Sequence, residues 1–471
     1  MDYSHDVIVI GGGAAGLTAA GGCALFGLRV ALIESGAMGG ECLNTGCVPS
    51  KALIAAAARA AEARVEERAG VTIAAPDIDW RGVRAFVRRA IADIAPHDSQ
   101  DRFEDMGCEV IREHARLTGP KTVEAGGRTL CAPRIVVATG SEPAVPPVEG
   151  LAQVPYLTNE TLFDLDERPE HLVILGGGNV GMEMAQAFRR LGSDVTVIEA
   201  NAIMGRDDRD SVAVLVAAMK AEGVAFVQGK VNRVSRQGGG VSVEVGGGTT
   251  LLARHLLVAT GRRARTGGLG LEELGIAMGD NGIAVDARRR SSLKHIYAIG
   301  DCRDGPRLTH VSAYEGSNVA LEIALGVPAR VDWRALPWCT YTSPEVAQVG
   351  LTESEARKRY GDRVTVVREP FDDNERAIAE GRTRGHIKLM LKGKKVVGAS
   401  ICGERAGELL LPIGQLITGK ASTFALGSAV VAYPTRAEIL KAAAFSAWEP
   451  TVFGTCPRRW AGLVQKMRRA R

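Results

Sequence analysis

Two cysteines that stand five positions apart, Cys42 and Cys47, are the residues of this chain best suited to redox chemistry. Gly46 precedes the second cysteine and permits the sharp bend that a small disulfide ring would need. Pro49 suits the first turn of a helix, so we expect Cys47 beside the positive end of that helix, where the pKa of a thiol falls. A disulfide in so short a loop is easily reduced, and the spacing therefore predicts a redox centre.

Two less reactive explanations of the cysteine pair fit the sequence poorly. A structural disulfide is typical of secreted proteins, yet the chain starts Met-Asp-Tyr-Ser-His-Asp without a basic and apolar leader, and its nine cysteines are scattered and odd in number. A zinc site would need a second Cys or His pair at matching spacing, and none lies nearby in the sequence. We therefore predict no resident metal and a catalytic use of the pair.

The composition predicts an α/β protein of several domains. The 471 residues are 46% hydrophobic and include 57 glycines, which is typical of a large core with many tight turns. The net charge of +4 gives no reason to expect nucleic-acid binding. No uninterrupted apolar segment is long enough to span a bilayer, so we expect a cytoplasmic protein.

A glycine-rich turn follows the first apolar strand, which we expect over residues 7–10. The turn has the spacing G-x-G-x-x-G and opens a small-residue helix predicted over 17–26. Its glycines let the backbone approach a pyrophosphate, whose charge would sit at the helix N-terminus. The next strand, 29–33, ends in an acid placed to accept hydrogen bonds from an adenosine ribose. The residues of this first nucleotide site are Gly11, Gly13, Gly16 and Glu34.

The same unit recurs later in the chain, with a strand over 172–175, a helix over 182–191 and a strand over 194–198. Each copy should hold its own dinucleotide. The carboxylate of Glu199 suits a free 2′-hydroxyl and repels a 2′-phosphate, which favours NADH over NADPH, although Arg206 could soften that preference. The residues of this second nucleotide site are Gly176, Gly178, Gly181 and Glu199.

Short signals mark further strand ends near the nucleotides. Val-Ala-Thr-Gly occurs twice in the chain. The candidate cofactor-binding residues from the two copies are Thr139, Gly140 and Gly261. The segment 296–301 is predicted to be an apolar strand that ends in Asp301, where an acid is well placed to bind a polyhydroxyl chain. Alternatively, Asp301 caps a helix after Gly300.

Taken together, residues from about 5 to 445 resemble the pyridine nucleotide-disulfide oxidoreductases, the flavoproteins that include dihydrolipoamide dehydrogenase, glutathione reductase and mercuric reductase. The most specific part is the stretch 39–51. The resemblance implies an α/β fold with two Rossmann-like domains, for FAD and for NAD(P), and a C-terminal α+β dimerisation domain. The stretch Thr340–Leu351 resembles the opening of that dimerisation domain. The expected division is an FAD domain over 1–148, an NAD(P) domain over 149–270, a return to the FAD domain over 271–334, a dimerisation domain over 335–450 and a basic tail over 451–471.

The resemblance also implies roles for the redox residues. Cys47 would be the thiolate against the flavin, Cys42 the cysteine that meets substrate, and Lys51 a cation near the flavin, paired with Glu183. NADH would pass hydride to FAD, which would reduce the Cys42–Cys47 disulfide. Gly40, within the same stretch, would join the cofactor-binding set. The chain would act as a homodimer whose active site is shared between subunits.

Near the C-terminus the sequence departs from the disulfide-handling members of this family. Those members carry His-Pro-Thr and, after two intervening residues, Glu, and the histidine reaches across the dimer as acid and base for the substrate thiol. Here Tyr433 takes the place of the histidine, while Glu438 is present. A phenol has a pKa of about 10 against about 6.5 for imidazole, so its use as a base at pH 7 costs roughly 4 kcal/mol more. Ordinary dithiol turnover should be handicapped, and Tyr433 would instead donate a hydrogen bond to an anion or a ligand.

The acceptor is therefore expected to be a metal ion, a quinone-like electrophile or an unusual thiol, with a dihydrolipoamide dehydrogenase variant as the alternative. Mercuric reductases also carry a tyrosine at this place, followed by a tail with adjacent cysteines that hand the metal ion inward. The tail here offers the single Cys456. Together with Cys42 and Cys47 it could complete a thiolate set for a thiophilic metal, or it is an ordinary residue in a terminal turn.

The last residues are predicted to form a basic amphipathic helix, because apolar residues recur at i, i+3, i+4 and i+7 among basic ones. Such an end, 456–471, could lie on an anionic membrane and recruit the protein there as an electron-transfer subunit, or it could bind a partner. More often such a stripe packs on its own dimer, and we expect that arrangement here. The apolar residues are Trp460, Leu463, Val464 and Met467, and the basic ones are Arg458, Arg459, Lys466, Arg468, Arg469 and Arg471.

Overall fold

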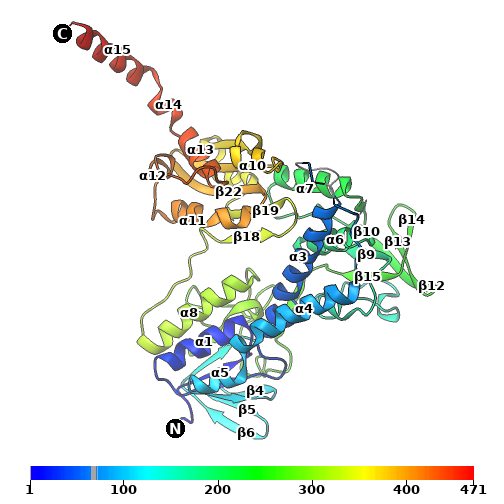
Figure 1. Cartoon of the computed structure of the whole chain (residues 1–471). Coiled ribbons are helices and arrows are strands. Elements are labelled where there is room, and N and C mark those ends of the chain that lie inside the picture. Colours follow the sequence, from blue (N-terminus) through cyan, green and yellow to red (C-terminus); the bar gives the residue numbers. More distant parts are fainter. Residues whose placement is uncertain (1, 65–69, 72, 471) are drawn as a thin grey trace. The chain divides into compact units, whose positions relative to one another are not determined.

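The chain forms two compact units in the computed structural model, which describes residues 2–64, 70–71 and 73–470 (Figure 1). The first unit combines Met1–Asn201 with Ala225–Val331, and the second combines Ala202–Val224 with Asp332–Arg471. Two residues at the ends of the predicted domains, Met1 and Arg471, lie outside the described residues.

A parallel sheet forms the centre of the N-terminal part of the first unit. All residues of its central strand are buried, as expected for a short apolar run with both faces covered. In spatial order the strands are β17 (Ile296–Ala298), β7 (Arg134–Val137), β1 (Val7–Ile10), β2 (Val30–Ile33) and β3 (Cys108–Ile111).

Two helices, α1 (Ala14–Leu25) and α8 (Thr309–Leu325), pack closely beside this sheet, so that segments almost 300 residues apart in the chain lie together (Figure 1). Gly316 permits the close approach, because a Cβ there would lie 2.7 Å from the carbonyl oxygen of Ala15. The other helices of this part are α2 (Gly40–Asn44), α3 (Cys47–Ala63), α4 (Trp80–Ile94) and α5 (Gln100–Asp105), and an antiparallel sheet consists of β4 (Ala115–Gly119), β5 (Thr122–Ala125) and β6 (Arg128–Cys131).

A second parallel sheet repeats the strand–turn–helix–strand arrangement within the first unit. Its strands in spatial order are β11 (Ala225–Gln228), β10 (Asp194–Glu199), β9 (His171–Leu175) and β15 (His255–Val258), and its helix is α6 (Asn179–Arg190). An antiparallel sheet of β12 (Val231–Gln237), β13 (Gly240–Val245) and β14 (Thr249–Ala253) adjoins it, and β8 (Ser141–Pro143) pairs with β16 (Arg262–Ala264).

The helices after the two glycine turns begin three residues earlier than the sequence patterns predicted. Gly13 and Gly178 act as the N-caps of α1 and α6, so the last glycine of each turn already lies inside the helix. The strand predicted over 296–301 is also shorter, because β17 ends at Ala298 and Asp301 lies in the 3₁₀ turn Gly300–Cys302.

The second unit is built on an antiparallel sheet with the spatial order β18 (Pro337–Thr340), β19 (Glu345–Gly350), β22 (Lys395–Gly403), β21 (His386–Lys392) and β20 (Val364–Pro370). Buried aliphatic residues of β21 and β22 pack with the helices α11 and α13 to form its core. The helices of the unit are α7 (Arg209–Ala221), α9 (Glu353–Tyr360), α10 (Glu375–Ala379), α11 (Leu410–Thr418), α12 (Thr423–Gly427), α13 (Glu438–Ser446), α14 (Glu449–Val452) and α15 (Thr455–Arg469).

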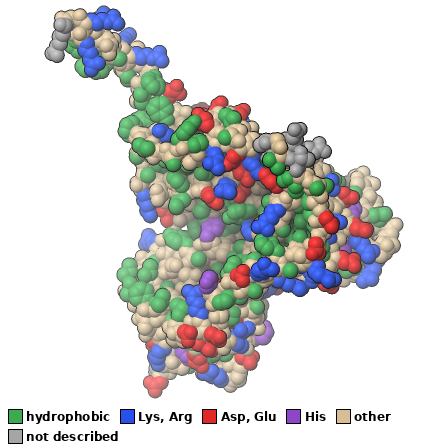
Figure 2. Space-filling model, viewed as in Figure 1, with side chains coloured by type: hydrophobic (Ala, Val, Ile, Leu, Met, Phe, Trp, Pro, Cys, Tyr) green, Lys and Arg blue, Asp and Glu red, His purple; other side chains and the backbone are tan. Residues whose placement is uncertain are grey.

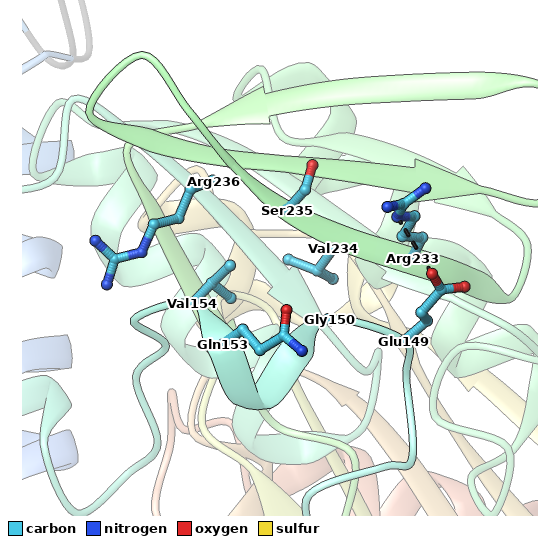
Figure 3. Close-up of a pocket in the computed structure, with 8 residues that line it drawn as sticks. All are labelled: Glu149, Gly150, Gln153, Val154, Arg233, Val234, Ser235 and Arg236. Atoms are coloured by element: carbon cyan, nitrogen blue, oxygen red, sulfur yellow. Dashed lines mark ion pairs between the residues drawn. The ribbon is translucent and has the colours of Figure 1, made fainter.

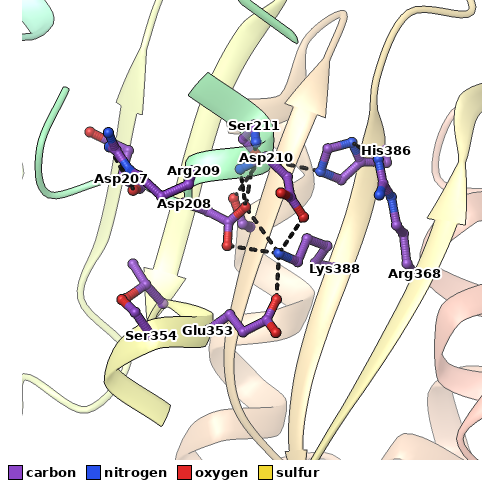
Figure 4. Close-up of polar contacts among 12 residues, drawn as sticks. Asp207, Asp208, Arg209, Asp210, Ser211, Glu353, Ser354, Arg368, His386 and Lys388 are labelled. Carbon is purple, nitrogen blue, oxygen red and sulfur yellow. Dashed lines mark hydrogen bonds and ion pairs between the residues drawn. The ribbon is translucent and has the colours of Figure 1, made fainter. Parts of the chain in front are cut away.

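The segment 202–224, which we predicted inside the nucleotide domain 149–270, groups with this second unit. Its helix α7 packs on β19 and β22, and a buried cation fixes its start (Figure 4). The ammonium of Lys388 lies 3.0 Å from Asp208, 2.9 Å from Asp210 and 2.6 Å from Glu353, and only 4% of the lysine side chain is exposed. These ion pairs explain the grouping, because Asp208 caps α7 while Lys388 stands on β21.

The architecture confirms the predicted fold class, with parallel nucleotide-type sheets and a C-terminal α+β domain. Within the described ranges, none of the helices is both long and apolar enough to cross a membrane.

Candidate active site

The cysteine-bearing stretch is held against the first glycine turn by backbone contacts that only glycines allow. The N–H of Gly39 donates to the carbonyl of Gly12 at 2.9 Å, and a Cβ on Gly40 would lie 2.7 Å from the Cα of Gly13. Gly40 also has φ +60, in the left-handed region. The structure thus brings two predicted sites, the redox loop and the first nucleotide turn, into direct contact.

Cys42 lies in the short helix α2, and Cys47 is the first residue of α3, as the sequence predicted for the second cysteine. Neither cysteine forms a disulfide in this structure. A hydrogen bond from Cys42, helped by one from Thr309 and by the charge of Lys51, lowers the pKa of Cys47 to about 6 against the opposing effect of burial. The same hydrogen bond to Cys47, together with burial, raises the pKa of Cys42. These opposite shifts favour ionisation at Cys47 before Cys42.

Thr309 was not among the residues that the sequence pointed to. Its Oγ1 lies 3.1 Å from the Sγ of Cys47, and it is the first residue of α8. The N-termini of α3 and α8 therefore meet at one sulfur, where their partial positive charges favour an anion. The one available signal was positional, since Thr309 begins the helix that follows β17 and the turn of Asp301.

Lys51 and Glu183 lie together, with the ammonium 2.8 Å from Oε2 of the carboxylate. Lys51 stands one turn after Cys47 on α3, and Glu183 comes from α6 of the second nucleotide fold. The carboxylate is 6% exposed and the lysine side chain 39%. The ion pair thus fixes a cation near the thiolate while α3 and α6 pack on each other.

The first glycine turn has the geometry that a dinucleotide needs. Gly11 has φ +112, and a Cβ on Gly16 would lie 1.8 Å from the Gly11 carbonyl oxygen, so both must be glycine. A Cβ on Gly13 would meet only Gly40, at 3.8 Å, which leaves room for a phosphate to approach the backbone. Glu34 ends the neighbouring strand and accepts the N–H of Gly12 at 2.5 Å.

The second glycine turn repeats this geometry residue for residue. Gly176 has φ +109, and a Cβ on Gly181 would lie 2.0 Å from its carbonyl oxygen, whereas a Cβ on Gly178 would meet nothing within 4 Å. Glu199 accepts the N–H of Gly177 at 2.7 Å, as Glu34 does for Gly12. The residues of both turns therefore fit a bound dinucleotide, with an acid held at the ribose end of each.

The two Val-Ala-Thr-Gly stretches meet where the chain crosses between the nucleotide folds. The hydroxyl of Thr139 donates to the carbonyl of Arg265 at 2.6 Å, and that of Thr260 donates to the carbonyl of Ala144 at 2.7 Å. Gly140 and Gly261 have φ +74 and +134, and a Cβ added to either glycine would meet no other atom within 4 Å. These glycines turn the chain and leave open space beside it.

Asp301 lies at the centre of a polar chain that reaches the cysteine loop. Ser141 donates to the Asp301 carboxylate at 2.7 Å, and Arg262 donates to Ser141 at 2.8 Å. Arg262 also pairs with Glu41, the residue before Cys42. Burial raises the pKa of Glu41 although the charge of Arg262 opposes it. Glu41 and Arg262 were missed in the sequence, because nothing local marks a pair separated by 221 positions.

Tyr433 and Glu438 belong to the second unit. The side chain of Tyr433 is exposed, with 72% of the residue accessible. Glu438 is the first residue of α13, and its carboxylate accepts the backbone N–H of Thr435 at 3.1 Å. The glutamate thus helps to hold the turn that presents Tyr433.

A surface pocket of about 290 Å³ lies elsewhere in the first unit (Figure 3). Its walls come from 149–154 and from β12, where the N–H of Val234 donates to the carbonyl of Glu149 at 2.8 Å and Arg233 pairs with the Glu149 carboxylate. The predicted site residues are not among those that line it, and we assign it no catalytic role. Across the described part of the chain, no three His, Cys, Asp or Glu side chains are grouped to hold a resident metal ion.

Comparison with known proteins agrees with this geometry. Residues 5–316 match the pyridine nucleotide-disulphide oxidoreductase family, and residues 336–444 match its dimerisation domain, which supports a homodimer. The chain is 34% identical to a mercuric reductase of Streptomyces lividans, over 93% of this chain and 95% of that protein. It is 36% identical to a dihydrolipoyl dehydrogenase of Thermus scotoductus, over 94% and 97%.

Solved structures extend the comparison to the fold. The Cu(II) complex of the HOCl-induced flavoprotein disulfide reductase RclA from Escherichia coli has a TM-score of 0.84 at 28% identity, covering 94% of this chain and 99% of that one. LpdA from Mycobacterium tuberculosis has a TM-score of 0.86 at 28% identity, with the same coverage. The resemblance expected from the sequence is confirmed, and this chain belongs to the pyridine nucleotide-disulphide oxidoreductase family as an FAD-dependent enzyme with a redox-active disulfide.

Proposed function

We propose that this flavoenzyme passes electrons from NADH to a thiophilic metal ion, with mercuric ion as the first candidate, through Cys42 and Cys47. The observation that carries the proposal is the exposed Tyr433 at the position where disulfide-handling relatives place a histidine. Reduction of a metal ion needs no proton at the acceptor, whereas dithiol–disulfide exchange needs an acid and base.

Bound FAD, held by the first glycine turn with Glu34 and Asp301, supplies the electron relay between the nicotinamide and the sulfurs. The residues of the chain bind the metal ion. Cys47 is kept as a thiolate by Cys42, Thr309 and Lys51, and so offers one soft anionic ligand at neutral pH. Cys42 loses its proton when a soft metal ion binds, because metal coordination displaces the S–H proton. Two thiolates then hold the ion for reduction.

Besides stabilising the thiolate, Lys51 provides a fixed positive charge. Its ion pair with Glu183 holds the ammonium in place, so the positive charge needs no rearrangement when negative charge develops nearby. Since Glu183 comes from the second nucleotide fold, the pair also links the redox loop to the fold that would bind NADH.

Tyr433 would serve the partner subunit's site in the homodimer, as the family's dimer implies. There the phenol can donate a hydrogen bond to a ligand of the incoming ion, such as chloride or a thiolate. It does not need to act as a base. The carboxylate of Glu438, engaged by the N–H of Thr435, keeps the turn of Tyr433 in shape.

NADH is the proposed donor. Glu199 is held by the N–H groups of Gly177 and Asn201, at 2.7 and 2.8 Å, at the end of β10. A fixed carboxylate there accepts ribose hydroxyls and repels a 2′-phosphate.

The relatives' names support the metal-ion proposal. Mercuric reductases match at 31–35% identity over at least 93% of this chain, and RclA has been solved as a Cu(II) complex. The balanced reaction is NADH + Hg²⁺ → NAD⁺ + H⁺ + Hg⁰, in which two electrons pass to one ion.

The deciding experiment starts from holoenzyme reduced anaerobically with NADH and mixes it in a stopped-flow instrument with one acceptor at a time. Mercuric ion, cupric ion, lipoamide, glutathione disulfide and a quinone are compared by the rate of reoxidation. We expect mercuric ion to be reduced fastest, with mercury vapour as the product, and Cys42→Ser to abolish this. Faster turnover with lipoamide would overturn the proposal.

A dihydrolipoamide dehydrogenase variant is the second candidate, because the Thermus scotoductus relative is 36% identical and Glu438 is retained. Dihydrolipoamide activity that survives Tyr433→Phe would favour it. A quinone as the fastest acceptor would overturn the metal-ion proposal in favour of the quinone-like electrophile.

A further inference from the structure

The C-terminal helix α15 carries a charge distribution unlike the rest of the chain. Residues 450–471 contain six basic residues and no acidic one, while the whole chain has a net charge of only +4. The 449 residues before them therefore carry a small net negative charge. Figure 2 shows basic side chains gathered over α15.

One face of α15 is apolar and exposed. Trp460, Leu463 and Met467 follow the i, i+3, i+7 spacing of a single helix face, and 64%, 49% and 51% of these residues are accessible. Val464 borders the same stripe and Cys456 begins it one turn earlier. By the 100° step of an α-helix, Arg468 flanks this stripe on one side and Arg459 and Lys466 flank it on the other.

The segment just before this helix packs on α13. Phe453 packs edge-on against Phe445 of α13, with 6.1 Å between ring centroids. Gly454 follows, and a Cβ there would lie 2.5 Å from the carbonyl oxygen of Pro450, so the turn into α15 requires glycine. None of the described residues of α15 is buried.

The match to the dimerisation domain ends at residue 444, before α15 begins. The helix thus lies beyond the matched segment, and its apolar face needs an explanation of its own. We propose that α15 docks on the surface of an anionic phospholipid bilayer, with its apolar stripe in the interface and its basic residues on the headgroups.

Charge and side-chain type are those of a helix that binds an anionic membrane surface. A body with a net negative charge is repelled by an anionic bilayer, so the contact must be made by the acid-free tail itself. Tryptophan prefers the headgroup level, and arginines beside an apolar stripe are the pattern of helices that lie in the interface. At 15 residues with five basic ones, α15 is too short and too charged to span the bilayer.

The test is co-sedimentation of the FAD-loaded full-length enzyme with vesicles of phosphatidylcholine, with or without about one-third phosphatidylglycerol. We expect binding to the anionic vesicles only, and its loss at about 1 M salt, where charge attraction is screened. Tryptophan emission should be quenched by brominated lipid. Trp460→Phe should keep the binding and lose most of the quenching.

A matched pair of variants separates the docking from simple charge attraction. Leu463→Glu and Gln465→Glu add the same negative charge two residues apart, but only the first lies on the apolar stripe. We expect Leu463→Glu to weaken vesicle binding at least tenfold more than Gln465→Glu. Equal loss by both, or no binding by the intact enzyme, would overturn the proposal.

Removal of residues 457–471, which retains Cys456, provides the last arm. We expect the truncated enzyme to remain a dimer and to stay off the vesicles, with NADH oxidation by its soluble acceptor unchanged. If truncation instead dissociates the dimer, α15 covers a second copy and the lipid proposal fails. Because vesicle binding is measured without any acceptor, its failure and the failure of the metal-ion proposal are separate results.

Discussion

The Sγ of Cys47 lies 3.1 Å from the hydroxyl of Thr309, although 262 positions separate the two residues. Each is the first residue of its helix, α3 and α8, so two helix N-termini converge on one sulfur. When Cys47 is ionised, the threonine hydroxyl donates to the thiolate, and this hydrogen bond lowers the pKa of Cys47. A residue far away in sequence thus helps to set the charge of the redox pair.

Thr309→Val should raise the pKa of Cys47, because it removes that donor and keeps the size of the side chain. A hydrogen bond to a charged group contributes about 1.5–3 kcal/mol, which corresponds to a rise of about one to two pH units. The pH dependence of the alkylation rate in reduced holoenzyme measures it. Thr309→Ser keeps the hydroxyl and should titrate as the wild type does. Equal titration of Thr309→Val and the wild type would refute the role of this contact.

The pH dependence of the thiolate follows from the same pair. Since the pKa of Cys47 is lowered to about 6, the thiolate should persist from pH 8 down to that value and disappear below it. An ordinary thiol would be half protonated at about pH 8.5. The long-wavelength absorbance of the thiolate beside the flavin reports this in two-electron-reduced enzyme. Cys47→Ser should abolish the band while FAD stays bound, and Cys42→Ser should retain it.

The nucleotide turns could be predicted from the sequence because everything that defines them is contiguous. A buried strand, a glycine spacing, a helix and a terminal acid such as Glu34 occur within one short stretch, and the structure places them as expected. The first three residues of α1 and α6 were missed, since glycine turns conceal where a helix begins. The pairing of Cys47 with the helix N-terminus was likewise readable from Gly46 and Pro49.

The contacts that tune the site could not be predicted, because they depend on how distant segments fold together. Glu41 and Arg262 carry no local signal, Thr309 has only its place at the start of a helix, and the partners of all three stand far away in the chain. The grouping of 202–224 with the second unit is of the same kind, because the buried Lys388 that holds it lies about 180 residues beyond Asp208. Pattern and propensity describe neighbours in sequence, whereas these pairs follow from the packing of whole sheets.

Glu199→Gln should shift the nucleotide preference toward NADPH. The amide keeps an oxygen for the N–H of Gly177 but removes the charge that repels a 2′-phosphate. The ratio of kcat/KM for NADPH to that for NADH should rise by about tenfold or more, since about 1.4 kcal/mol corresponds to a factor of ten. The rate of NADH oxidation with a fixed acceptor measures both values. An unchanged ratio would show that another residue, such as Arg206, decides the preference.

Tyr433→His should create or strongly raise lipoamide reduction. An imidazole titrates near pH 6.5 and a phenol near 10, and a well-placed acid and base contributes about 10²–10⁴ in rate. Steady-state kcat/KM for lipoamide with NADH, measured anaerobically, reports the gain, while metal-ion reduction should change little. Tyr433→Phe serves as the control and should leave lipoamide turnover as low as in the wild type. If the histidine brings no gain, the missing base does not explain the choice of acceptor.

Lys388→Met should destabilise the second unit, because it leaves the buried carboxylate of Asp208 without its cation (Figure 4). Breaking a buried ion pair in this way costs about 3–5 kcal/mol. The exposed Lys395, at the start of the neighbouring strand, provides the control, and Lys395→Met should change the free energy of unfolding by less than about 0.5 kcal/mol.

The pH dependence of this loss has a definite sign. The hydrogen bond from Lys388 lowers the pKa of Asp210, and for Glu353 the contacts with Lys388 and Arg357 outweigh burial and lower the pKa as well. The stability that these carboxylates contribute is therefore present above their ordinary pKa of about 4 and is lost as the pH falls through their lower folded values. The difference between wild type and Lys388→Met should therefore be largest near pH 7 and shrink toward pH 3. Adding Asp208→Asn should recover part of the loss at pH 7, because no buried charge then lacks a partner. Denaturant unfolding followed by circular dichroism measures all three proteins, and a loss that is independent of pH would point to packing instead of charge.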